Sequence, residues 1–100
     1  MSNIINDIIM MLKDKPEVTK SNEHWPIEKG IYSISGIKKY MRSKGYTNDM
    51  TDQALYTINK DKRSLEFVNI YNRKYKQNFP YFFLDLTDEE VKNIKKSYES

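Results

Sequence analysis

Apolar residues at the start of the chain recur with the period of an α-helix. Five of them would share one side of a helix over residues 3–14, namely Ile4, Ile5, Ile8, Ile9 and Leu12. Ser2 or Asn3 can cap its N-terminus, and Pro16 cannot continue it. The pattern therefore predicts an amphipathic helix that buries one face.

The next stretch has no helical period. Residues 15–30 contain breakers at Pro16, Pro26 and Gly30, which predicts an irregular connection. Residues 30–34 then alternate between apolar and polar side chains, as in a very short strand.

Two further helices are expected in the middle of the chain. Ser35 is a suitable N-cap for a helix over residues 36–44, and Gly45 follows at the position where glycine ends helices. After a tight turn, Asn48 can cap a third helix. Its buried side is predicted to carry Met50, Ala54, Leu55 and Ile58.

Two runs rich in aromatic and β-branched residues follow, and they predict a β-hairpin. They cover residues 65–71 and 79–86, with a long polar and basic loop between them. Pro80 cannot donate a ladder hydrogen bond, so that end of the second strand is expected at an edge. The core is expected to receive most of the aromatic side chains, among them Tyr32, Tyr40, Tyr71, Tyr81 and Phe83.

The C-terminal segment carries a helix start signal. Thr87 and Glu90 form the T-x-x-E pattern of a capping box, and Leu86 with Val91 can form a hydrophobic staple. Val91, Ile94 and Tyr98 would face inward from this last helix. The same capping accounts for the acidic residues 88–90, with a magnesium site as the less favoured reading.

Composition limits the classes of function. With 100 residues, the chain suits a single domain spanning 1–100, whose core is expected over 31–86. It has no cysteine and one histidine, so we expect no disulfide, no zinc site and no other cofactor. We also expect no enzyme, because no nucleophile–base pair and no glycine-rich phosphate loop occur. The first apolar stretch is too short for a membrane span, which favours a cytoplasmic protein.

The charge is concentrated in the middle of the chain. Residues 29–76 contain eleven basic and four acidic residues, a net charge of +7, whereas the whole chain carries +3. A basic centre between mildly acidic ends favours a polyanionic partner, although a solvated lysine-rich surface would give the same count.

The order helix, short strand, helix, tight turn, helix, β-hairpin, helix resembles that of winged helix-turn-helix domains, over residues 35–86. Gly45 at the end of the second helix and the Ala54-Leu55-x-x-Ile58 pattern of the third carry the resemblance. It implies an α+β fold in which the hairpin is a wing. An unrelated α+β fold with the same element order is the alternative.

The resemblance implies binding of double-stranded DNA by a bacterial, plasmid or phage transcriptional regulator. The third helix would enter the major groove, and the second helix and the wing would meet phosphates. The implied contact residues are Lys38, Lys39, Arg42, Gln53, Tyr56, Asn59, Lys60, Arg63, Arg73, Lys74, Tyr75 and Lys76. The first and last helices would form the surface of a homodimer.

A second hypothesis is a phage-type inhibitor or adaptor that binds a host protein and not DNA. Asp49 and Asp52 favour it, because they lie on or near the outward face of the third helix and would repel phosphate. On this view Tyr56 and Tyr75 would be anchors in a protein interface.

Overall fold

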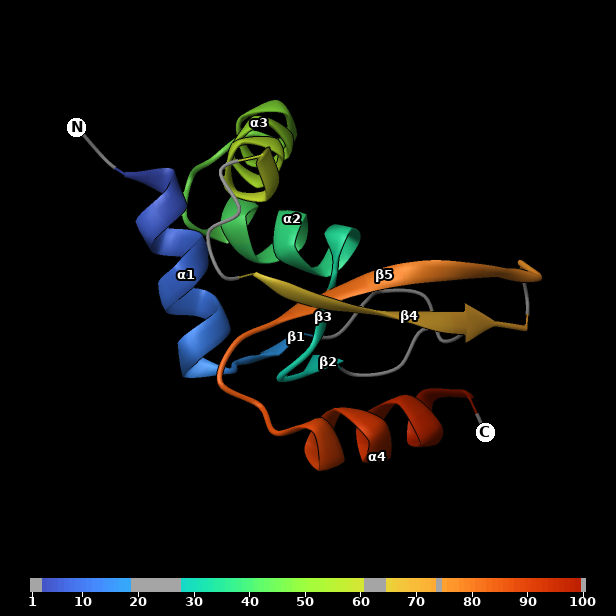
Figure 1. Ribbon diagram of the computed structural model, residues 1–100. Helices are drawn as coiled ribbons and strands as arrows, with labels where there is room; N and C mark the ends of the chain where they lie inside the picture. Colours follow the sequence, from blue (N-terminus) through green and yellow to red (C-terminus); the bar gives the residue numbers. More distant parts are fainter. Residues whose placement is uncertain (1–2, 19–27, 61–64, 74, 100) are drawn as a thin grey trace.

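The computed structural model describes residues 3–18, 28–60, 65–73 and 75–99, and of residues 28, 29, 59 and 60 it describes the backbone. It is an α+β domain in which four helices surround a three-stranded antiparallel sheet (Figure 1). The elements, in chain order, are α1 (Ile4–Asp14), β1 (Glu17–Val18), β2 (Glu28–Lys29), β3 (Tyr32–Ser33), α2 (Ile34–Ser43), α3 (Asn48–Lys60), β4 (Glu66–Asn72), β5 (Gln77–Phe83) and α4 (Asp88–Glu99).

The sheet has the order β3-β5-β4, so the short strand pairs with the second strand of the hairpin. Cross-strand neighbours share a face, and the two faces bury different clusters. Val68 pairs with Tyr81 on the face that α4 covers. Phe67 pairs with Phe82 on the other face, where Phe82 joins the core of α1, α2 and α3. In Figure 1, α2 and α3 lie on one side of the sheet and α4 on the other.

Helix α1 begins one residue later than expected, and its cap is as expected. The Asn3 side chain accepts a hydrogen bond from the backbone N–H of Asn6 at 3.3 Å. The segment after it, expected to be irregular, contributes two short strands that pair with each other, β1 and β2.

Both central helices use a different cap from the one expected. Ser33, not Ser35, caps α2 by accepting from the N–H of Gly36 at 3.0 Å, so the helix starts directly after β3. Thr47, not Asn48, caps α3 by accepting from the N–H of Met50 at 3.2 Å. In each case a second polar residue near the start of the helix has the reach that a cap requires, and Ser33 also has the extended backbone of an N-cap.

The buried side of α3 differs from the expectation at one position. Met50 is 44% exposed, and Thr51 is fully buried in its place, with its hydroxyl donating to the Thr47 carbonyl. Ala54, Leu55 and Ile58 are buried as expected. Met50 is apolar but lies one residue, about 100°, before Thr51 on the helical wheel, at the side of the buried stripe, whereas a threonine can satisfy its hydroxyl within the helix.

The hairpin loop is short, which corrects the prediction of a long one. The strands continue to the pair Asn72–Gln77, so only residues 73–76 remain in the loop. Asn72 accepts from the N–H of Tyr75 at 3.1 Å, and Lys76 adopts φ 54°, which reverses the chain within four residues. At the other end, Asp85 with φ 54° turns the chain away after Phe83, so residues 84–86 are not part of the strand.

Four of the five aromatic residues expected in the core are buried or partly buried. Tyr32, Tyr81 and Phe83 are buried, and Tyr40 packs partly buried against the first cluster. Tyr71 is 42% exposed, because it lies on the same face of β4 as Phe67 but near the tip of the hairpin, which extends beyond the helices (Figure 1).

The start of α4 is as the sequence predicts. Thr87 accepts from the N–H of Glu90 at 3.1 Å, and Glu90 accepts from the N–H of Thr87 at 3.0 Å. Val91, Ile94 and Tyr98 pack against the sheet, and the rings of Tyr98 and Tyr81 meet edge to face with centroids 5.6 Å apart.

Candidate nucleic-acid interface

Helices α2 and α3 form one rigid unit through a tight turn. The N–H groups of Gly45 and Tyr46 return to the carbonyls of Arg42 and Met41, and Gly45 has φ 94°, which glycine adopts without strain. The Tyr46 ring is buried and its hydroxyl donates to the carboxylate of Asp7 on α1. The turn is thereby fixed to the body of the domain.

The exposed face of α3 lies opposite its buried stripe. Four of its side chains are exposed there at helical spacing, namely Asp49, Asp52, Gln53 and Tyr56. The Tyr56 side chain is 68% exposed. The structure therefore brings Gln53 and Tyr56 together as expected, but two carboxylates lie on the same face.

One of these carboxylates is paired with a lysine of α2. The Nζ of Lys38 lies 2.9 Å from Oδ1 of Asp52, and the Asp52 side chain is half exposed. The pair joins the two helices and offsets a charge that would repel phosphate. It also means that Lys38, expected to contact phosphate, has its charge balanced within the protein.

The other basic residues of α2 remain on the surface. Arg42 is exposed and Lys39 is partly exposed. Lys44, which the sequence reasoning did not single out, places its Nζ 5.5 Å from the centre of the Tyr40 ring. The sequence signal for Lys44 was its position at the C-terminus of the helix, just before Gly45, because cations stabilise helix C-termini.

The tip of the hairpin carries two further residues of the expected contact set. Arg73 and Lys76 are exposed there, and the hairpin extends beyond the helices (Figure 1). For Asn59 and Lys60 the structure describes the helical backbone only, and Arg63 and Lys74 lie outside the described residues. The structure thus places the side chains of α2 and α3 on two neighbouring helices, whereas Arg73 and Lys76 lie at the separate tip of the hairpin.

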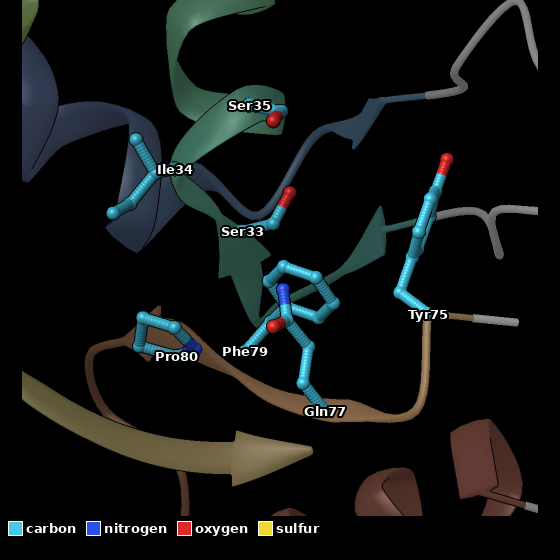
Figure 2. Close-up of a pocket in the computed structure, with 7 residues that line it drawn as sticks. All are labelled: Ser33, Ile34, Ser35, Tyr75, Gln77, Phe79 and Pro80. Atoms are coloured by element: carbon cyan, nitrogen blue, oxygen red, sulfur yellow. The ribbon is translucent and has the colours of Figure 1, made fainter. Parts of the chain in front are cut away.

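Tyr75 at the tip is 47% exposed and contacts its own hairpin, with its ring edge-on to Phe79 at 6.1 Å between centroids. It borders a pocket of about 320 Å³ between the hairpin and the start of α2 (Figure 2). The lining residues are Ser33, Ile34, Ser35, Tyr75, Gln77, Phe79 and Pro80. The pocket arises because β3 ends at Ser33, opposite Tyr81, and leaves the side of β5 beyond it open.

Two other classes of site have no counterpart among the described residues. No group of three His, Cys, Asp or Glu side chains gathers there in a way that could hold a metal ion. None of the described helices combines the length and the apolar character that crossing a bilayer requires.

Comparison with known proteins identifies no relative. No protein-family model matches the chain, and neither a curated protein nor a solved structure is significantly similar to it. The function must therefore be argued from the geometry alone.

Proposed function

We propose that this protein is a small DNA-binding protein, a bacterial, plasmid or phage transcriptional regulator that uses α3 and a basic wing. The observation that supports this most directly is the sheet order β3-β5-β4 beside the α2–turn–α3 pair. This layout resembles that of a winged helix, in which the third helix would be the recognition helix and the hairpin the wing.

The exposed side chains of α3 supply groups that can read bases. Gln53 can pair bidentately with adenine, and Tyr56 offers an exposed ring beside it. The carboxylate of Asp52 is engaged by Lys38, so it does not present an unbalanced charge to the groove.

Phosphate contacts would come from cations on either side of that face. Arg42 and Lys39 on α2 and Arg73 and Lys76 on the wing are all at least partly exposed. Such contacts position a protein on DNA and dominate its affinity through the release of counterions.

The experiment is a titration of labelled duplex DNA, followed by fluorescence anisotropy at several salt concentrations. We expect the affinity to fall steeply with salt. Arg42→Ala and Arg73→Ala should each weaken binding to all duplexes and reduce the slope of log K against log salt by about one.

Lys92→Ala is the matched control, because Lys92 is an exposed cation on α4, across the sheet from α2 and α3. It should leave both affinity and slope unchanged. Failure of the wild-type protein to bind duplex DNA at about 50 mM salt would overturn the proposal, because non-specific electrostatic binding is strongest there.

The second candidate is a module that binds a host protein. The observation in its favour is the face of α3 itself, where Asp49 accompanies a tyrosine that is 68% exposed. Exposed tyrosines are typical anchors of protein interfaces. Tyr56→Ala would then abolish capture of the partner while the protein shows no affinity for DNA.

A further inference from the structure

Strand β4 is an edge strand along its whole length. Among the described residues no strand pairs with its outer side, because the order β3-β5-β4 leaves β4 at the edge of the sheet. It spans seven residues, and positions 67–72 carry no charge. Natural edge strands are commonly kept apart by lysines, prolines or bulges, and this one has none of them between Phe67 and Asn72.

A single hydrogen bond shows which backbone groups point outward. The N–H of Tyr71 donates to the carboxylate of Glu99 on α4 at 2.9 Å, so it faces away from β5. Backbone groups alternate between the two sides of an antiparallel strand. The N–H and C=O groups of Phe67 and Asn69 therefore also point to the open edge.

Pro80 agrees with this alternation. Pro80 lies opposite Asn69, and by the alternation these two residues form a pair that makes no hydrogen bonds between β4 and β5. Such a position does not need the backbone N–H that proline lacks. The nitrogen of Pro80 points to the other side of β5, beyond the end of β3. No strand lies opposite it there among the described residues, so no hydrogen bond between strands is lost.

The side chains along this edge are complementary to themselves. Phe67 is 56% exposed and Tyr71 is 42% exposed, and they lie two residues on either side of Asn69 on one face. An antiparallel two-fold axis through Asn69 would place each Phe67 opposite the Tyr71 of the other copy. On the opposite face, each Val68 would meet the other copy's Ile70. Aromatic and β-branched pairs are the favoured cross-strand neighbours.

We propose that the outer edge of β4 is a homodimer surface, on which a second copy of this chain adds its own β4 antiparallel and in register about Asn69. The two three-stranded sheets would become one six-stranded sheet. Helices α1 and α4 are less suited to self-association, because their apolar faces already pack within the domain.

The axis stands perpendicular to the sheet, so equivalent faces of the two copies lie on the same side. Both α2–α3 units would therefore face one way, and both α4 helices the other. The proposal does not rest on DNA binding, since it follows from the edge of the sheet and can be tested without nucleic acid.

Glu99 limits the association in this arrangement. Its carboxylate occupies the N–H of Tyr71 that the partner's Phe67 carbonyl would need. Glu99→Ala should remove this competition and raise the association constant several-fold, whereas a merely structural role of Glu99 would not favour the dimer.

The first measurement is sedimentation equilibrium over a range of protein concentrations. We expect the mean mass to rise from 12.0 kDa toward twice that value. Phe67→Lys should hold the mass at that of the monomer, because it replaces the aromatic partner of Tyr71 in each pair with a charged side chain. Phe67 is exposed in the monomer, and a far-ultraviolet circular dichroism spectrum checks that the variant is folded.

The second measurement uses the absence of cysteine from the chain. Asn69→Cys introduces one thiol at the axis, where paired Cα atoms about 5.5 Å apart suit a disulfide. Under mild oxidation this variant should form a covalent dimer faster than Asn6→Cys, a matched control at an exposed site on α1.

The possible results distinguish a failure of this proposal from a failure of the proposed function. A monomer at all concentrations, equal cross-linking of the two cysteine variants, or a dimer that survives Phe67→Lys would each overturn the proposal. Loss of DNA binding alone would leave it standing and would contradict only the proposed function.

Discussion

Lys38 and Asp52 meet at 2.9 Å where α2 packs against α3, and this ion pair changes what each residue offers to a partner. Asp52 alone would repel phosphate, and Lys38 alone would attract it. Together their charges nearly cancel on the proposed interface, so the exposed cation of α2 there is Arg42.

Asp52→Asn should therefore strengthen DNA binding. The substitution removes a negative charge and releases Lys38, so the salt slope should become steeper by about one phosphate contact. The change in stability should be small, within about 1 kcal/mol, because the pair is partly exposed. Anisotropy titrations and urea unfolding measure the two effects, and weaker DNA binding in this variant would contradict the assignment of Lys38.

Burial distinguishes two methionines that look alike in the sequence. Met41 is fully buried and Met50 is 44% exposed. Met41→Ala should lower the free energy of unfolding by about 2–5 kcal/mol, because it removes buried contacts and leaves a cavity. Met50→Ala should change it by less than about 0.5 kcal/mol. Urea unfolding compares the two, and equal losses would show that Met50 is buried in solution.

At the scale of the elements, α4 is the helix whose start the sequence determines best. Thr87 and Glu90 cap each other reciprocally, and both hydrogen bonds depend only on residues three apart. The hydrogen bonds from the backbone and the side chain of Thr87 lower the pKa of Glu90 below its ordinary value of 4.5. A carboxylate with a lowered pKa stabilises the fold above its ordinary pKa, and that contribution is lost as the pH falls through the lowered value.

Thr87→Ala should remove this cap. We expect a loss of about 0.5–2 kcal/mol near neutral pH, as for other N-cap substitutions. The pKa of Glu90 should rise only part of the way toward its ordinary value, because the backbone N–H of residue 87, the larger cause of the lowered pKa, still donates to Glu90. Urea unfolding measures the loss, and unchanged stability near neutral pH would argue against the capping box.

At the scale of the whole molecule, the sheet separates two apolar clusters and couples them. Ile8 on α1 belongs to the cluster that includes Phe82, whereas Ile94 on α4 packs against Ile70, Tyr81 and Phe83. Because β5 contributes alternate side chains to both clusters, loss of either one should weaken the strand that supports the other.

Ile8→Ala and Ile94→Ala should therefore both shift one cooperative transition. We expect about 2–5 kcal/mol for Ile8, which is fully buried, and less for Ile94, which is partly buried. Thermal unfolding followed by far-ultraviolet circular dichroism measures the midpoints. A separate early transition in Ile94→Ala would mean that α4 and its cluster unfold on their own.

Signals that involve only residues close together in the sequence were sufficient to predict much of the fold. Gly45, the capping box at Thr87 and the apolar periods of the helices predict the order and type of the main elements. Where two polar residues compete for one cap, as Ser33 and Ser35 do, the result depends on the backbone conformation, which sequence patterns do not specify.

The candidate site was less predictable for the same reason. Gln53, Tyr56 and Arg42 are exposed as their helical positions indicate. The pairing of Lys38 with Asp52 joins residues 14 positions apart, and it depends on how closely α2 and α3 pack. The open edge of β4 depends on which strand takes the central place, and only the pairing of β3 with β5 decides that.

The sequence by itself determined that the chain forms amphipathic helices around a hairpin with a basic middle, because periodicity and capping act between residues a few positions apart. The tertiary structure alone decided which charges neutralise each other and which backbone edge stays open. Those outcomes depend on distances between elements remote in the chain, and packing sets these distances.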